Sequence, residues 1–292
     1  MQLKTRAITP YLYLLPTALL VLFIYGYPLV KIFDFSLRRV RGITGEFVGL
    51  QNYLFLFKDP IFRQAVANNL RLFVLIPFLV ALALLFAFVL FGERIRGRRF
   101  FQVTLFLPYI LAIPVVGIVF GYMFTLNGVV NEILRAVGLK FLAIDWLGDP
   151  KYALWTLMII IVWKEVGFGI ALFLARLMSV DSSLYDSARL DGAGWWQQLF
   201  YITIPQLRTI IEFFAIITVI NMLSWVFAYS YTITMGGPGW STLVMELYIY
   251  NKLARSQIPN PGTASAASVV LFLITTILIA LSARLRRRLT EE

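Results

Sequence analysis

Lys164 and Glu165 stand next to each other inside a long apolar run of this sequence. A charged side chain inside a membrane segment is costly, and such residues usually belong to a substrate or ion pathway. Because adjacent positions of a helix do not face each other, we expect no mutual ion pair between these two side chains. One would face a solute pathway and the other a neighbouring subunit.

A second group of polar and aromatic residues recurs at helical spacing in a later apolar run. Aromatic rings can stack on sugar faces, and Asn or Ser side chains can hydrogen-bond to hydroxyl groups. A structural interpretation stays open, because Trp and Tyr also anchor membrane edges and Asn also joins helices. The predicted solute pathway contains Trp163, Glu165, Phe168, Asn221, Ser224, Trp225 and Tyr229.

Covalent and metal chemistry has little support in the residue types. The chain contains neither cysteine nor histidine, which excludes disulfides, thiolate nucleophiles and most metal sites. The G-x-x-x-x-G-K-[ST] phosphate loop is also absent, so this chain is not an ATPase. We therefore expect no enzymatic activity, no cofactor bound by this chain and no metal, which weakens the alternative of a membrane enzyme.

The composition is that of a membrane protein. Hydrophobic residues make up 60% and charged residues 14% of the 292 residues, and the mean hydropathy is +0.81, whereas soluble domains have about 25% charged residues. The net charge of +11 would suggest nucleic-acid binding in a soluble protein. Here basic residues mark the cytoplasmic edges of membrane helices, so we expect no nucleic-acid partner.

Six apolar runs are long enough to cross the membrane, since a helix needs about 20 apolar residues to span roughly 30 Å of hydrocarbon. We expect an all-α, polytopic membrane protein in which residues 1–292 form a single transmembrane domain. The six predicted transmembrane helices cover residues 11–33, 70–91, 102–124, 153–176, 207–230 and 264–284.

The placement of basic residues predicts the orientation. An even number of spans puts both termini on one side of the membrane. Lys and Arg are denser on the side that holds the termini and loops 92–101 and 177–206, which favours a cytoplasmic location for that side of a plasma membrane. Arg38, Arg39 and Arg41 on the other side blur the contrast. The high density of basic residues on the side of the termini comes from two clusters, which contain Arg94, Arg96, Arg98, Arg99, Arg284, Arg286, Arg287 and Arg288.

Loop 177–206 contains signals for a short polar helix. Ser183 and Asp186 have the spacing of a capping box, which predicts a helix that starts near Leu184. Gly192 is a typical residue just after a helix end. A helix of about two turns is marginal in isolation. Docking into a groove on another protein would stabilise it.

A bend and a second short helix follow in the same loop. Ala193 and Gly194 form the predicted bend, and a helix from Trp195 to about Ile202 then leads to Pro205. Proline suits the first turn of a helix, so Pro205 is expected to open the fifth span.

The segment from Asp186 to Gly194 resembles the EAA loop of ABC-importer permeases. In that family an acidic-small-small triplet precedes a D-G-A sequence, and here Asp186 stands in place of the usual glutamate. The alternative is an ordinary helix lying on the membrane surface. The resemblance implies contact with an ATP-binding subunit through Tyr185, Asp186, Ser187, Ala188, Arg189, Asp191, Gly192, Ala193 and Gly194.

The resemblance extends along the chain, to the carbohydrate-uptake branch of MalF/UgpA-like permeases. It is carried by Phe47–Tyr53, Phe106–Pro108, Asp145–Pro150, Trp163-Lys164 and Gly236–Pro238. It implies a permease subunit of a binding-protein-dependent ABC importer for a sugar or sugar derivative. The implied partners are a second, similar permease, two ATP-binding subunits that use ATP and Mg, and an extracellular solute-binding protein.

Two alternatives to a sugar importer stay open. An importer of glycerol phosphate or another polyol ester would have the same architecture. A self-sufficient secondary transporter would show an internal repeat and helices broken at matching positions, and the sequence shows neither.

Overall fold

The computed structural model describes residues 2–41, 44–92 and 96–290, so Arg94 lies outside the described residues. The chain divides into two compact units. The first unit comprises Met1–Arg63 and Tyr248–Ile274, and the second comprises Gln64–Leu247 and Thr275–Glu292. The organisation as a single domain stays a prediction.

The first unit begins with a long apolar helical run. This run consists of α1 (Gln2–Val21), a π-helical turn (Leu22–Gly26) and α2 (Tyr27–Ser36). From Tyr11 to Ser36 it is long and apolar enough to cross a membrane, and its most apolar window has no buried residue. Its apolar side chains are therefore left to lipid or to another subunit.

A small hairpin and a helix follow in the first unit. Strands β1 (Arg38–Arg41) and β2 (Thr44–Phe47) pair antiparallel, and α3 (Gln51–Lys58) comes next. The amide of Asn52 donates hydrogen bonds to the carbonyl oxygens of Ser36 (2.8 Å) and Arg38 (2.9 Å). The segment Phe47–Tyr53 thus fixes the end of the first membrane helix.

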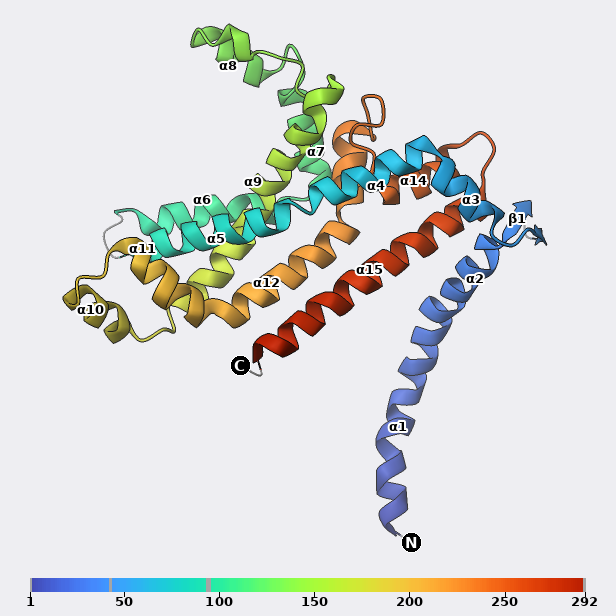
Figure 1. Cartoon of the computed structure of the whole chain (residues 1–292), viewed down its shortest axis with the longest axis horizontal. Coiled ribbons are helices and arrows are strands. Elements are labelled where there is room, and N and C mark those ends of the chain that lie inside the picture. The colour runs from blue at the N-terminus through green and yellow to red at the C-terminus, as the bar shows by residue number, and fades with distance from the viewer. Residues whose placement is uncertain (1, 42–43, 93–95, 291–292) are drawn as a thin grey trace. The chain divides into compact units, whose positions relative to one another are not determined.

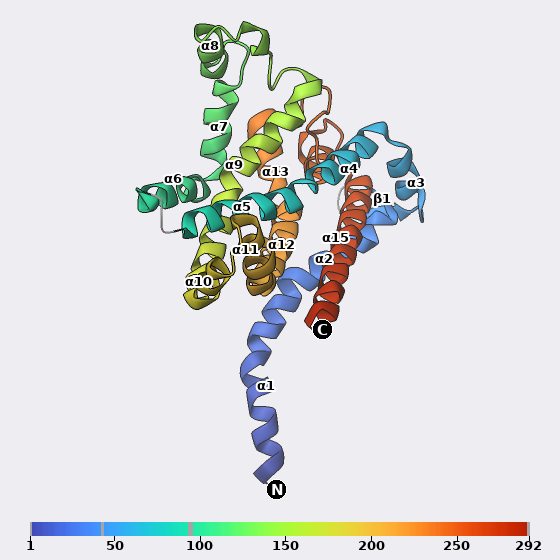
Figure 2. The ribbon, with the colours of Figure 1, turned by 60° about the vertical axis from the view of Figure 1, so that its left-hand side comes forward.

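The second unit consists of helices and their connections (Figures 1 and 2). Three helices, α4, α14 and α15, have residues in both units. The remaining elements of the chain are α4 (Pro60–Leu72), α5 (Leu75–Phe91), α6 (Arg98–Ile110), α7 (Ile113–Met123), α8 (Val129–Ala136), a 3₁₀ turn (Lys140–Leu142), α9 (Pro150–Leu177), α10 (Ser182–Leu190), α11 (Trp195–Gln198), a π-helical turn (Leu199–Thr203), α12 (Ile204–Ser224), α13 (Val226–Tyr229), a π-helical turn (Ser230–Thr234), α14 (Met245–Tyr250), a π-helical turn (Asn251–Arg255) and α15 (Pro261–Thr290).

Helix α9 is the centre of the second unit and packs against α5, α6 and α12. Two glycines make this packing close. A Cβ atom on Gly167 would collide with the carbonyl oxygen of Leu105 in α6, and one on Gly169 would collide with Ala83 in α5 and Phe214 in α12. Small residues allow membrane helices to approach in this way. The side chain of Asp149 accepts a hydrogen bond from the N–H of Lys151 (2.8 Å) and caps the start of α9.

The third predicted span, 102–124, is not one straight helix. Helices α6 and α7 are bent by 99° at the break between Ile110 and Ile113. Leu111 and Ala112 have extended ψ angles of 138° and 136°, and Pro114 stands in the first turn of α7. Proline lacks an N–H donor, so Pro114 cannot continue the hydrogen-bond pattern of α6 and is instead accommodated in the first turn of a new helix. The described residues hold five helices able to cross a membrane, or up to six if the bent pair is one span.

The fifth span also differs from its prediction. The expected separate helix from Trp195 to Ile202 joins α12, so that Trp195–Ser224 is one helical run. A π-helical turn, Leu199–Thr203, lies directly before Pro205 in the first turn of α12. The helical run then changes geometry at Trp225, before the predicted end at residue 230.

Candidate functional site

Helix α10 starts two residues earlier than predicted, and its N-cap is Asp181 rather than Ser183. The Asp181 side chain accepts a hydrogen bond from the N–H of Ser183 (2.9 Å), which lowers the pKa of Asp181. Asp186 makes no capping box, because its carboxylate pairs with Arg189 at 3.1 Å on the exposed surface. Asp181 directly precedes the first helical residue, where a side-chain oxygen can accept from a free N–H, whereas Ser183 lies inside the helix.

The predicted end of α10 at Gly192 is confirmed. Gly192 has a φ of +80°, a conformation that favours glycine. The N–H of Gly192 donates to the carbonyl of Arg189 (3.1 Å), and the N–H of Ala193 donates to the carbonyl of Ala188 (2.8 Å). These two hydrogen bonds form the Schellman motif, which satisfies carbonyls at the helix end.

Tyr185 points into the protein rather than toward solvent. Its side chain is buried, with 3% exposure. Its ring lies 5.3 Å from the Phe91 ring and 6.4 Å from the Phe88 ring, both in α5, and its hydroxyl is hydrogen-bonded to that of Thr203 (3.0 Å). Burial raises the pKa of Tyr185, so the phenol stays neutral. Tyr185 therefore fastens α10 to α5 and to the start of α12.

The opposite face of α10 is exposed. Side chains two and five residues after Tyr185 lie about 200° and 140° around the helix from it, because successive residues turn by 100°. These are Ser187 and Leu190, and Leu190 is 89% exposed. Figure 2 shows α10 at one end of the second unit and α8 at the other. This face of α10 is therefore not covered by the described part of the chain.

A shallow depression of about 350 Å³ adjoins α10. Four of the residues expected to contact an ATP-binding subunit line it, namely Ala188, Asp191, Gly192 and Ala193. Gln197, Tyr201 and Ile202 complete the lining and were missed by sequence reasoning. The side chain of Gln197 accepts a hydrogen bond from the Gly194 N–H (2.6 Å), as in a capping box. The position of Gln197 three residues after Gly194 could have predicted this contact from the sequence.

Lys164 and Glu165 form an ion pair, contrary to the expectation that they would not. The Lys164 Nζ lies 3.5 Å from the Glu165 Oε1, and the two side chains are only 4% and 12% exposed. Lys164 also donates to the carbonyl oxygen of Tyr109 (3.2 Å), and the Tyr229 hydroxyl donates to Glu165. The rule for adjacent positions describes exposed helix surfaces. In the interior, an unpaired charge is so costly that long side chains bend to meet.

Five of the predicted pathway residues surround one small cavity in the second unit. They are Glu165, Phe168, Asn221, Trp225 and Tyr229. Trp225 directly follows α12, and its N–H donates a hydrogen bond to the carbonyl of Asn221 (2.8 Å) at the end of that helix. The cavity has a volume of about 20 Å³, which is room for about one water molecule. It is closed to any larger solute in this conformation.

The other two predicted pathway residues lie elsewhere. Trp163 contacts Phe120 of α7, with ring centroids 4.8 Å apart, and lines a larger groove. Ser224 is not among the residues that line either cavity. Phe214 and Thr218 of α12 line the small cavity and were missed. The available signal was their helical spacing, because Phe214 lies seven residues before Asn221 and Thr218 lies seven residues before Trp225.

Metal binding has no visible site in the described part of the chain. Within residues 2–41, 44–92 and 96–290, no group of three or more His, Cys, Asp or Glu side chains could hold a metal ion.

The fold matches solved transporter structures. Two chains of a bacterial alginate ABC transporter align with this chain at TM-scores of 0.83 and 0.81, with 24% and 26% sequence identity. The first alignment covers 98% of this chain and 96% of the other, and the second covers 98% and 97%. One of the two structures includes a periplasmic protein with bound alginate pentasaccharide.

Curated relatives match over nearly the whole chain. The lactose transport system permease protein LacF of Rhizobium radiobacter is 34% identical over 271 residues, covering 92% of this chain and 90% of the relative. The sulfoquinovosyl glycerol transport system permease protein SmoG of Agrobacterium fabrum is 32% identical, covering 94% and 89%. The family model described as binding-protein-dependent transport system inner membrane component matches residues 59–291. The chain belongs to this family of multi-pass permeases of ABC importers.

Proposed function

We propose that this chain imports a sugar or sugar derivative as one permease subunit of an ATP-driven transporter. The observation that carries the proposal is the match to relatives named as permeases for lactose, sulfoquinovosyl glycerol, diacetylchitobiose and arabinooligosaccharides, each across more than 90% of this chain. The cavity chemistry fits a sugar, because Trp225 can stack on a ring face and Asn221 can bond to hydroxyl groups.

The proposal includes partners, because this chain has no phosphate loop. Two ATP-binding subunits would hold ATP and Mg, and a second permease would complete the membrane pore. The family description names dependence on a binding protein, which supports an extracellular solute-binding partner.

In the proposed mechanism, closure of the ATP-binding subunits moves α10. Tyr185 passes this movement to α5 and α12, because its ring and hydroxyl contact Phe91 and Thr203. These helices also border the small cavity, through Leu79 of α5 and Asn221 of α12. Tilting them would open the cavity to one side of the membrane and then to the other, which is alternating access. Both termini and α10 would face the cytoplasm, the orientation that basic residues favour.

The pathway assignment predicts a specific loss in the variant Trp225→Ala. Removing the stacking surface should raise the half-saturating solute concentration roughly tenfold or more, by analogy with the stacking of a nucleic-acid base on an aromatic side chain, which contributes about 1–3 kcal/mol. The measurement is ATP-dependent uptake of labelled sugars into proteoliposomes that contain the complete transporter. A panel with a polyol phosphate beside the sugars identifies the solute class.

The matched control is Trp155→Ala, a tryptophan on α9 that is 66% exposed and lies outside this cavity. It should leave the half-saturating concentration unchanged. If Trp225→Ala transports with wild-type concentration dependence, this face does not line the pathway. If the transporter takes up the polyol phosphate and none of the sugars, its solute is a polyol ester and the sugar proposal is wrong.

A further inference from the structure

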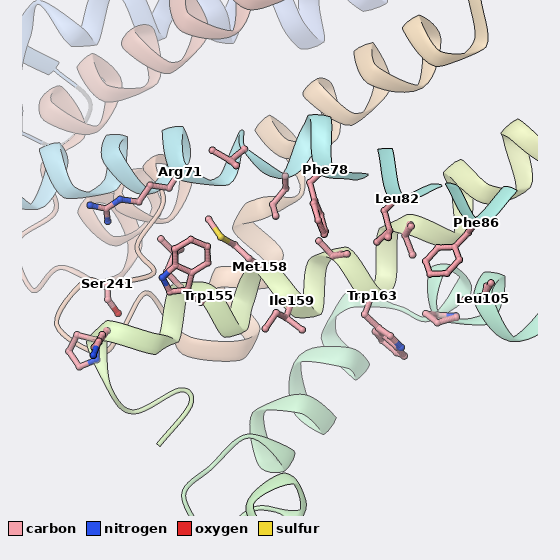
Figure 3. A pocket seen from close by; sticks show the side chains of 18 of the residues that line it. Arg71, Phe78, Leu82, Phe86, Leu105, Trp155, Met158, Ile159, Trp163 and Ser241 are labelled. Atoms are coloured by element: carbon pink, nitrogen blue, oxygen red, sulfur yellow. The ribbon is translucent and has the colours of Figure 1, made fainter. Parts of the chain in front are cut away.

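A long groove of about 850 Å³ runs along the second unit between α5, α6 and α9. Large apolar side chains line it at intervals of four residues on two helices. Figure 3 shows them facing the groove: Phe78, Leu82 and Phe86 from α5, and Trp155, Ile159 and Trp163 from α9. Phe78, Trp155 and Ile159 are more than half exposed, so the chain itself leaves this lining uncovered.

One end of the groove is cationic. Arg71 and Lys151 line this end, and none of the described residues that line the groove is acidic. Neither cation forms an ion pair within the described part of the chain. Arg71 donates only a 3.3 Å hydrogen bond to the Asn68 side chain, and the Lys151 Nζ lies 5.1 Å from the Tyr152 ring centroid.

A buried hydroxyl adds to this polar end. Ser241 lies near Arg71 in Figure 3, at the opposite end of the groove from Phe86. Its side chain is 9% exposed, and its Oγ makes no hydrogen bond within the described residues. Buried polar groups usually have a hydrogen-bond partner, so this end is suited to a ligand with acceptor oxygens.

We propose that the groove binds an anionic phospholipid, with its phosphate at Arg71, Lys151 and Ser241 and an acyl chain along the aromatic lining. The dimensions agree. From Lys151 to Val166, both of which line the groove, α9 rises about 22 Å at 1.5 Å per residue. One leaflet of a bilayer, with half the hydrocarbon core and one headgroup region, measures about 20–22 Å.

A transmembrane helix of another subunit fits the groove less well. Such a helix needs about 30 Å to cross the hydrocarbon. The groove, with a length of about 22 Å along α9, is shorter than such a helix. A charged end beside an otherwise apolar lining matches the charged headgroup and apolar tail of a lipid.

The test uses the complete transporter in nanodiscs of phosphatidylcholine with a minor fraction of phosphatidylglycerol. After purification, native mass spectrometry counts the phosphatidylglycerol that stays bound. The variant Arg71→Gln/Lys151→Gln should retain roughly tenfold less phosphatidylglycerol than the wild type, because two cationic contacts to the headgroup are lost. The control Arg135→Gln/Lys140→Gln removes the same charge outside the groove and should retain lipid like the wild type.

A second variant distinguishes the competing occupant. The chain has no cysteine, so Trp155→Cys introduces a single reactive site in the groove. A photoactivatable maleimide at this position should crosslink to phospholipid. Equal lipid retention by the two double variants, or crosslinking to the second permease instead, would overturn the proposal. The readout is bound lipid rather than uptake, so its failure leaves the proposed sugar transport untouched.

Discussion

Replacing Tyr185 with alanine should uncouple ATP hydrolysis from solute uptake. Tyr185 is the buried residue of α10, and it contacts the rings of Phe88 and Phe91 and the hydroxyl of Thr203. Truncating a buried aromatic side chain costs about 3–5 kcal/mol. A helix of nine residues is marginal without such packing, so α10 would lose its fixed position on α5 and α12.

The expected result is more than a tenfold loss of uptake per ATP hydrolysed, because docking of the ATP-binding subunits would no longer move the membrane helices. Uptake and phosphate release are measured together in proteoliposomes. The control Tyr185→Phe keeps the ring and loses a hydrogen bond of about 1 kcal/mol. It should couple nearly as well as the wild type. Normal coupling in Tyr185→Ala would show that α10 does not transmit movement through this residue.

Replacing Lys164 with methionine should strongly destabilise the transporter. The change leaves the Glu165 carboxylate inside the protein with Tyr229 as its remaining partner. Removing one member of a buried ion pair costs about 3–5 kcal/mol, because the other charge stays buried without compensation. The midpoint of thermal unfolding, followed by size-exclusion chromatography of the complex, should fall clearly.

The double variant Lys164→Met/Glu165→Gln distinguishes this explanation from a packing defect. It removes both charges and keeps side chains of similar size, so most of the lost stability should return. Lys140→Met, at an exposed lysine, is the control and should unfold like the wild type. If the double variant is as unstable as Lys164→Met alone, the pair does not account for the loss.

Local signals in the sequence predicted the elements that depend on neighbouring residues. Gly192 ends α10 because only a left-handed conformation closes its last turn, and that preference belongs to the residue itself. The fourth span was predicted to start at residue 153, whereas α9 starts at Pro150, and the local signals of Asp149 as N-cap and Pro150 in the first turn were not used in that prediction. The apolar runs predicted the membrane helices because hydrocarbon thickness fixes their length.

Features that depend on packing could not be predicted in this way. The inward direction of Tyr185 follows from Phe88 and Phe91, nearly a hundred residues earlier in the chain. The Lys164–Glu165 pair follows from burial, which spacing on a helix does not report. The bend between α6 and α7 had a local signal in Pro114, but hydropathy alone merged the two helices into one span.

The central claim is that the exposed face of α10 docks on an ATP-binding subunit in the cytoplasm. The most direct measurement uses Ser187→Cys, a single cysteine on the face opposite Tyr185 in a chain that has no other cysteine. A membrane-impermeant maleimide is applied to vesicles from either side, with and without the ATP-binding subunits. Lys140→Cys, an exposed position in the loop between α8 and α9, is the control.

The account predicts that Ser187→Cys reacts only from the cytoplasmic side and becomes protected when the ATP-binding subunits assemble. Lys140→Cys should react from the opposite side in both states. Labelling of Ser187→Cys from outside the cell, or equal labelling with and without the ATP-binding subunits, would contradict the account.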